Sequence, residues 1–81
     1  MTVLFGEGVS GVFEQLPRAV QLEAAKLIDL LAIHPKMYPV RRRGIMKGYR
    51  YFVVHNYLFY YSVSSTEVRI AAVIPGQMMQ A

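Results

Sequence analysis

Three short runs rich in β-branched and aromatic residues constrain the fold of this chain more than any other feature. They span residues 49–54, 57–63 and 67–74, and each has the length and composition of a strand. The break at residues 55–56 suits a tight hairpin, because its Asn tolerates the positive φ that such a turn demands. The second break, residues 64–66, is a polar loop of Ser and Thr. The pattern predicts a three-stranded antiparallel meander.

Side chains of a strand alternate between the two faces of a sheet. In the second run one face receives Tyr57, Phe59, Tyr61 and Val63, and the other receives Leu58, Tyr60 and Ser62. In the third run one face receives Val68, Ile70, Ala72 and Ile74, and the other receives Glu67, Arg69, Ala71 and Val73. Both faces therefore hold apolar groups, and we expect each face to be covered.

The N-terminal half predicts one strand and two helices. Residues 2–5 form a short β-branched and aromatic run that would join the meander. Ser10 is the expected N-cap of a helix that Pro17 limits to about two turns. A second helix is predicted over residues 17–33, ended by the proline that follows His34. Its buried stripe at helical spacing comprises Val20, Ala24, Leu27, Ile28 and Leu31.

The chain is more apolar than so small a body needs. It has 81 residues, of which 54% are hydrophobic and 17% charged, and a chain of this length buries only about 60 to 65% of its unfolded surface. Leu22, Leu30 and Ile33 lie outside the buried stripe of the second helix. We expect the surplus to form an interface with a second copy or a partner, although scattered exposed leucines are also common.

Positive charge is concentrated between the helices and the meander. The segment 36–47 contains Pro39 and Gly44, residue types that interrupt helices and strands, and it is predicted to be irregular. No acidic residue lies between Asp29 and Glu67. A local patch of this kind attracts nucleic acid or an acidic protein segment, or serves only as a solubilising loop. The candidate cations for an anionic partner or target are Lys36, Arg41, Arg42, Arg43, Lys47, Arg50 and Arg69.

Several site classes find no support in the sequence. There is no cysteine, which excludes disulfides and thiolate sites, and the five carboxylates are dispersed, so no metal site or other cofactor is expected. No phosphate-binding glycine motif is present. His34 and His55 could act as an acid and base pair in RNA cleavage, but their spacing does not indicate that they meet. Without a signal or membrane-spanning segment, we expect a soluble, cytoplasmic protein that binds rather than catalyses.

Two stretches resemble the RelE/ParE superfamily of type II toxins. They are QLPRAVQLEAAKLIDLLAIHP and RRGIMKGYRYFVVHNYLFYYSVSSTEVRIAAVIPG, and the resemblance extends over about residues 3–77. It implies a single domain over residues 1–81 with an α+β fold, in which a short N-terminal strand and a two-helix hairpin precede a three-stranded meander packed on the helices. It also implies a toxin that a cognate antitoxin neutralises.

The superfamily contains two functions, and single residues help to distinguish them. RelE-like members are ribosome-dependent mRNA endonucleases, and by resemblance Arg50 and His55, with the neighbouring arginines, would be the catalytic candidates here. However, Phe52 and Leu58 stand where that mechanism expects basic residues, and Gln77 or Met78 occupies a further basic position. Each lost stabiliser of a developing anion costs about 10² to 10³ in rate, so catalysis of this kind is not expected.

The second predicted strand is closer to ParE-like members, which bind and poison DNA gyrase, although the first helix is shorter than theirs. The resemblance therefore favours a gyrase-binding toxin. The alternatives are a RelE-like endonuclease acting on the ribosome and mRNA, or a degenerate module that retains only antitoxin binding. An amphipathic acidic antitoxin would form a hetero-oligomer with this chain. Its expected contacts are Leu22, Leu30, Ile33, Tyr60, Met78 and Met79.

Overall fold

The computed structural model describes residues 1–76. The elements in order are β1 (Thr2–Phe5), α1 (Val9–Glu14), α2 (Arg18–Ile33), β2 (Arg50–Val54), β3 (Tyr57–Val63) and β4 (Glu67–Pro75). All the predicted elements are present, and the α+β prediction is confirmed. The starts of α2 and β2 and the end of β4 each lie one residue later than predicted.

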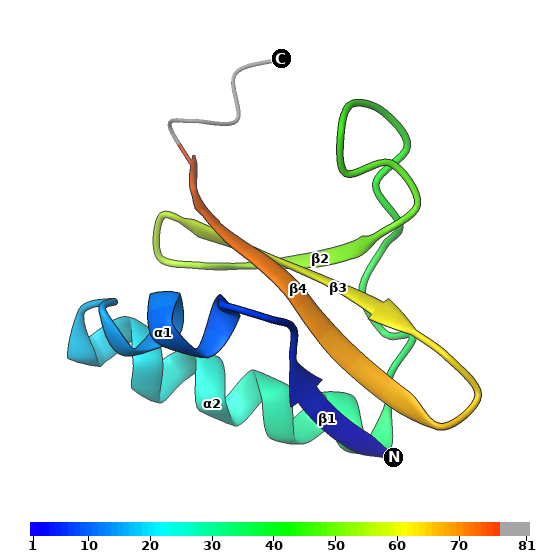
Figure 1. Cartoon of the computed structure of the whole chain (residues 1–81), viewed down its shortest axis with the longest axis horizontal. Helices are drawn as coiled ribbons and strands as arrows, with labels where there is room; N and C mark the ends of the chain where they lie inside the picture. Colours follow the sequence, from blue (N-terminus) through cyan, green and yellow to red (C-terminus); the bar gives the residue numbers. More distant parts are fainter. Residues whose placement is uncertain (77–81) are drawn as a thin grey trace.

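The sheet contains four strands in the order β1-β4-β3-β2. β2, β3 and β4 form the predicted antiparallel meander, and β1 pairs with β4 in parallel, with Val3 opposite Val68. Both helices lie on the same face of the sheet (Figure 1). At the exit from β1, the Gly6 amide donates to the carbonyl of Ile70 at 2.8 Å. A Cβ at Gly6 would lie 3.1 Å from that oxygen, so this close approach favours glycine.

The start of α1 differs from the prediction. Its N-cap is Gly8 with φ 78°, not Ser10, which lies inside the helix. The chain turns sharply between β1 and α1, and the left-handed conformation of that turn suits glycine better than a residue with a side chain. Pro17 occupies the N-cap of α2, and the His34 amide at its other end donates to Leu30 O at 2.8 Å.

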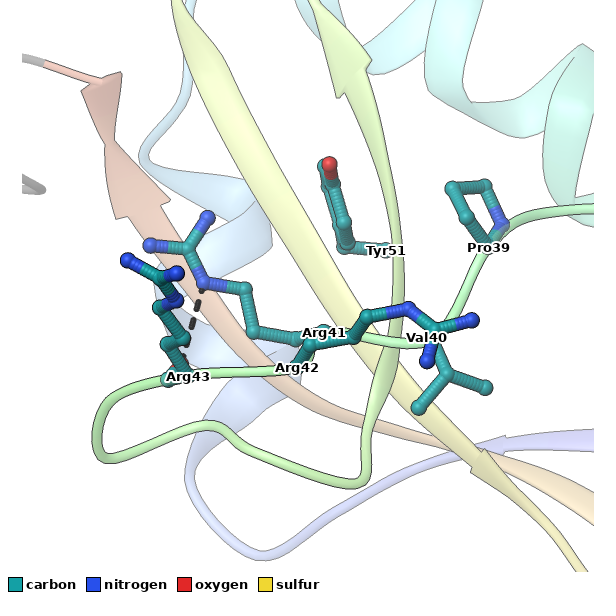
Figure 2. Close-up of a pocket in the computed structure, with 6 residues that line it drawn as sticks. All are labelled: Pro39, Val40, Arg41, Arg42, Arg43 and Tyr51. Carbon is teal, nitrogen blue, oxygen red and sulfur yellow. Dashed lines mark hydrogen bonds between the residues drawn. The ribbon is translucent and has the colours of Figure 1, made fainter.

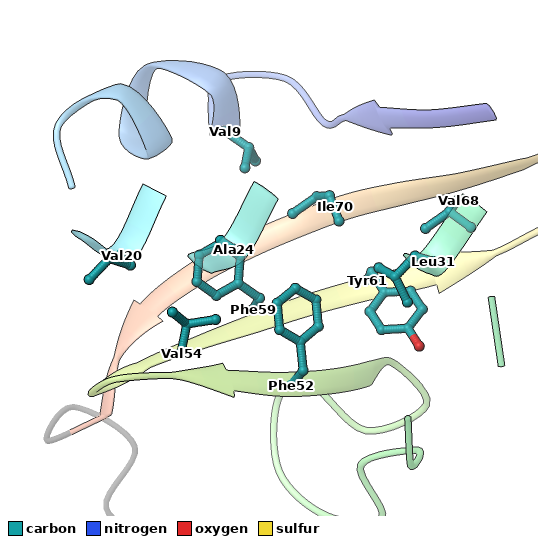
Figure 3. Close-up of a cluster of buried hydrophobic side chains, with 10 residues drawn as sticks. All are labelled: Val9, Val20, Ala24, Leu31, Phe52, Val54, Phe59, Tyr61, Val68 and Ile70. Carbon is teal, nitrogen blue, oxygen red and sulfur yellow. The ribbon is translucent and has the colours of Figure 1, made fainter. Parts of the chain in front are cut away.

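The core lies between the helices and the sheet (Figure 3). Its buried members are Val9, Val20, Ala24, Leu31, Phe52, Val54, Phe59, Tyr61, Val68 and Ile70. Leu27 and Ile28 pack against them, so the predicted stripe of α2 is confirmed. At the centre, the rings of Phe52 and Phe59 stack at 5.0 Å between centroids. The aromatic residues of neighbouring strands therefore hold the middle of the sheet together.

A β-bulge overturns the predicted alternation in β4. Tyr60 lies opposite Ala72, but the next residue, Tyr61, lies opposite Ile70, which leaves Ala71 as the extra residue of the bulge. Beyond it Val73 pairs with Phe59 and packs against the core. Ala72 and Ile74, which we predicted on the same face as Val68 and Ile70, are thereby turned to the opposite face of the sheet.

That opposite face, which we call the helix-free face, is only partly covered. Tyr60 is 0% exposed there, and its ring lies 5.8 Å from that of Tyr51. Val53 on the same face is 54% exposed. The expectation that both faces are covered therefore holds fully only on the helix side.

Candidate binding surfaces

The segment between α2 and β2 ends in an ordered hairpin, which we call the basic hairpin (residues 39–50). Val40 forms an antiparallel bridge with Arg50. The Arg41 amide donates to Tyr49 O at 2.7 Å, and the Gly48 amide donates back to Arg41 O at 2.9 Å. This part of the predicted irregular segment is therefore a continuation of the β2 edge, although residues 41–49 contain no strand of their own.

Three arginines surround a hollow at the base of this hairpin (Figure 2). The Arg41 guanidinium lies over the Tyr51 ring, 5.9 Å from its centroid, and Arg41 Nε donates to Arg43 O at 3.3 Å. Figure 2 shows the side chains of Arg41 and Arg43 extending together, while Arg42 extends toward Val40. The geometry gathers like charges beside an aromatic ring, an arrangement suited to an anionic ligand.

Arg50 does not join this group. It lies on the core side of β2 with Phe52 and Val54, and its Nη1 donates to the carbonyl oxygens of Tyr38 at 2.7 Å and Lys36 at 3.3 Å. Its guanidinium therefore holds the connection from α2 in place.

Tyr61 anchors the same connection. Its hydroxyl donates to Pro35 O at 2.9 Å, close to the carbonyls that Arg50 binds. Burial raises the pKa of the Tyr61 phenol, an effect that the nearby Arg50 charge opposes. Because the neutral phenol is the donor, the raised pKa keeps this hydrogen bond intact through neutral pH.

The remaining candidate polar residues are dispersed. Arg69 lies two strands from β2 and pairs with Glu67 at 2.8 Å. Lys36 is exposed in the connection after α2. His34 ends α2, whereas His55 occupies the β2–β3 turn with φ 53°, and these two places lie at opposite sides of Figure 1. The structure therefore does not bring the two histidines together.

A second candidate surface is apolar and lies along the outer side of α2. Leu22, Leu30 and Ile33 are exposed as predicted, with Ile33 70% exposed. Beyond the helix, Ile33, Pro35 and Met37 line a shallow hollow. Tyr60 is fully buried, so its prediction as an interface residue is corrected. Met78 and Met79 lie outside the described residues.

Sequence reasoning missed two features. Ile45, at the tip of the basic hairpin, is 99% exposed, and its position in a glycine-flanked basic segment was the available signal. The second is the anchoring role of Arg50 and Tyr61, for which the sequence offers no local signal. Within residues 1–76, no cluster of three His, Cys, Asp or Glu side chains could hold a metal ion. No helix in this range is long and apolar enough to cross a membrane.

Comparisons with known proteins agree with this architecture. Residues 11–80 match the model of the family described as ParE toxin of type II toxin–antitoxin system, parDE. Among solved structures, a chain in the crystal structure of the archaeal RelE–RelB complex from Pyrococcus horikoshii OT3 superposes with a TM-score of 0.75. It is 17% identical, and the match covers 93% of each chain. No significant match is found among curated proteins.

Proposed function

The chain belongs to the ParE toxin family of type II toxin–antitoxin systems, and from this premise we propose that it inhibits DNA gyrase by binding it. The proposal includes a cognate antitoxin that neutralises the toxin, and it places the action in the cytoplasm. The description of the matched family as a ParE toxin supports the choice of branch.

The observation on which the proposal mainly depends is the engagement of Arg50. A RelE-like mechanism would need this guanidinium to face a scissile phosphate. Here both of the hydrogen bonds that its side chain makes within residues 1–76 are to backbone carbonyls, those of Tyr38 and Lys36. Turning this guanidinium away from the carbonyls toward an RNA phosphate would break these bonds, and a hydrogen bond from a charged group contributes about 1.5 to 3 kcal/mol.

Two further positions support a noncatalytic toxin. Phe52 is buried in the core, and Leu58 is a half-buried aliphatic on the helix-free face. Neither provides charge to a developing phosphorane. Among the cations proposed for target binding, the side chains of Arg42, Arg43 and Lys47 have no hydrogen bond or ion pair within residues 1–76, whereas Arg50 and Arg69 already have partners.

The purified chain should be added to gyrase with relaxed plasmid, and in parallel to ribosomes programmed with mRNA. We expect supercoiling to be inhibited and the mRNA to remain intact. Cleavage of ribosome-bound mRNA that disappears in Arg50→Ala would instead show a RelE-like enzyme. If neither activity is found and expression does not arrest growth, the chain retains antitoxin binding alone.

The outer side of α2 is the surface we propose for the antitoxin. Leu30 and Ile33 are exposed one turn apart, next to the apolar hollow that continues to Met37. An amphipathic segment can lay its apolar side on such a surface, and Lys36 at the border of the hollow favours acidic residues in that segment.

The antitoxin proposal is tested by searching the reading frames beside this gene for a small acidic protein and mixing any such protein with the chain. Copurification and a raised melting temperature of the mixture are expected, because a ligand of the native state stabilises it by mass action. Leu30→Ala/Ile33→Ala should weaken the complex. Val53→Ala, which truncates an exposed aliphatic on the helix-free face, is the matched control. Equal binding by both variants would remove α2 from the interface.

A further inference from the structure

The tip of the basic hairpin presents an aliphatic side chain to solvent. Ile45 is 99% exposed and follows Gly44, whose φ of 82° turns the chain at this point. The Lys47 amide donates to Gly44 O at 3.1 Å and closes the turn. Removing such a side chain from water is favourable, so the isolated chain leaves this stabilisation unused. Figure 1 shows the hairpin projecting away from the helices.

Within residues 1–76, the cations of the basic hairpin have no acidic partners. In the part of the chain that the structure describes, the ion pairs are Lys26–Glu23 and Arg69–Glu67, and neither belongs to the hairpin. In Figure 2 the side chains of Arg41 and Arg43 extend toward the same side, and Arg41 Nε lies 3.3 Å from Arg43 O, so two like charges come from one short stretch of chain and favour an anion beside them. The planar guanidinium fork matches the oxygens of a phosphate.

We propose that the basic hairpin is a DNA-contacting element. Arg41, Arg42 and Arg43 bind backbone phosphates, and Ile45 enters the minor groove between them as an apolar wedge. Aliphatic side chains set among cations are used in this way to part base steps and bend a duplex. The binding energy would come mainly from neutralised phosphates and the release of their counterions.

The surface fits duplex DNA better than other anionic partners. Proteins bind single strands by stacking bases on exposed rings, but Tyr51 lies under Arg41 and Tyr60 is fully buried. A stable complex with an acidic protein would need about 800 Å² from this side, and the hairpin tip offers one isolated aliphatic residue. A duplex instead provides regularly spaced phosphates and a groove about 6 Å wide.

This inference concerns the chemistry of the hairpin and does not require gyrase as the target. Binding of DNA by a chain that leaves supercoiling unaffected would uphold the DNA contact and overturn the gyrase proposal. Inhibition of supercoiling by a chain that does not bind DNA would do the reverse.

The test measures the fluorescence anisotropy of a labelled duplex of about 20 base pairs, mixed with the full chain, while the salt concentration is raised. Because phosphate contacts release counterions, the affinity should fall as salt rises. Removing two phosphate contacts in Arg42→Ala/Arg43→Ala should reduce the slope of log K against log salt by about 2. Between 50 and 200 mM salt, the unchanged protein should therefore lose about ten-fold more affinity than the variant.

The matched control is Arg18→Ala/Lys26→Ala, which removes the same charge from exposed positions of α2. It should retain the slope of the unchanged protein. The proposal is overturned if the unchanged chain does not bind the duplex, if the control and hairpin variants lose equal affinity, or if a single strand or polyglutamate of matched length binds more tightly.

Ile45→Ala tests the wedge separately. A duplex containing 2-aminopurine should become brighter when the unchanged chain unstacks its bases, and this increase should be lost in Ile45→Ala while the salt slope is kept. Because Ile45 makes so little contact with the fold, the substitution should leave the melting temperature within about 4 °C of that of the unchanged chain. Equal fluorescence with both proteins would remove Ile45 from the proposed contact.

Discussion

Replacing Arg50 with alanine tests whether this residue is an anchor or a catalyst. In the structure one nitrogen, Nη1, donates to Tyr38 O at 2.7 Å and to Lys36 O at 3.3 Å. Both acceptors belong to the connection between α2 and the basic hairpin. The Tyr61 hydroxyl holds the same connection through Pro35 O. If Arg50 is an anchor, its replacement should therefore lower folding stability. If it is a catalyst, its replacement should lower activity alone.

The expected loss follows from these contacts. The bond at 2.7 Å is a short charge-assisted one, and such bonds contribute about 1.5 to 3 kcal/mol, while the contact at 3.3 Å adds little. Because Arg50 is half-buried, water can partly replace it, and we expect Arg50→Ala to cost about 2 kcal/mol. In a domain of this size, that loss lowers the melting temperature by about 8 to 16 °C.

Thermal and urea unfolding followed by circular dichroism measure this loss. Arg42→Ala is the control, because Arg42 is exposed and has no ion pair or hydrogen bond within residues 1–76; it should stay within about 0.5 kcal/mol of the unchanged chain. Arg50→Lys keeps the charge without the planar fork and should recover part of the loss. In a double-mutant cycle with Tyr61→Phe, we expect coupling, because both side chains hold one segment. The anchoring role is refuted if Arg50→Ala unfolds like Arg42→Ala.

Three other substitutions test the core, the buried phenol and the hairpin turn. Phe59→Ala should cost about 3 to 5 kcal/mol out of a total of about 4 to 12 kcal/mol expected for this length, and calorimetry should show a melting temperature at least about 12 °C lower. The folded-state pKa of Tyr61 is raised, so the contribution of this phenol to folding stability is complete below the unfolded value of 10.0 and falls as pH rises above it. Urea titrations above pH 10 should therefore show an extra loss of stability that is absent in Tyr61→Phe. If the substitution leaves the pH dependence unchanged, the assignment to Tyr61 is contradicted. Gly48→Ala should destabilise the chain by about 1 to 2 kcal/mol, because the φ angle of Gly48 is 93°. Gly11→Ala in α1, where an added Cβ meets no other atom, should instead stabilise the chain by about 0.5 to 1 kcal/mol in the same unfolding assay. Equal effects of the two substitutions would contradict the role given to the Gly48 turn.

The periodic parts of the sequence predicted the periodic parts of the fold. The strand runs, the β1 segment and the buried stripe of α2 all appear where the pattern places them. These features depend on which side chains are removed from water, and the spacing of apolar residues along the sequence indicates that directly. The absence of basic residues at Phe52 and Leu58 was likewise visible in the sequence, and it directed the functional reasoning toward binding.

The start of α1 and the course of the basic hairpin were less accessible. Ser10 has the chemistry of an N-cap, but the sharp exit from β1 placed Gly8 there instead. The segment before β2 looked irregular because its glycines and prolines interrupt any pattern. It nevertheless pairs with β2 through backbone groups, and backbone hydrogen bonds leave no trace in side-chain periodicity.

The sequence by itself determined the elements, the apolar surplus and the local excess of positive charge, since each is set by residue types along a short stretch. Only the tertiary structure decided which side chains those elements direct at one another. The bulge at Ala71 exchanged the faces of Val73 and Ile74, because strand register depends on the neighbouring strand. The direction of Arg50 toward the carbonyls of Tyr38 and Lys36 was decided in the same way, since those acceptors reach it only when the chain has folded back on β2.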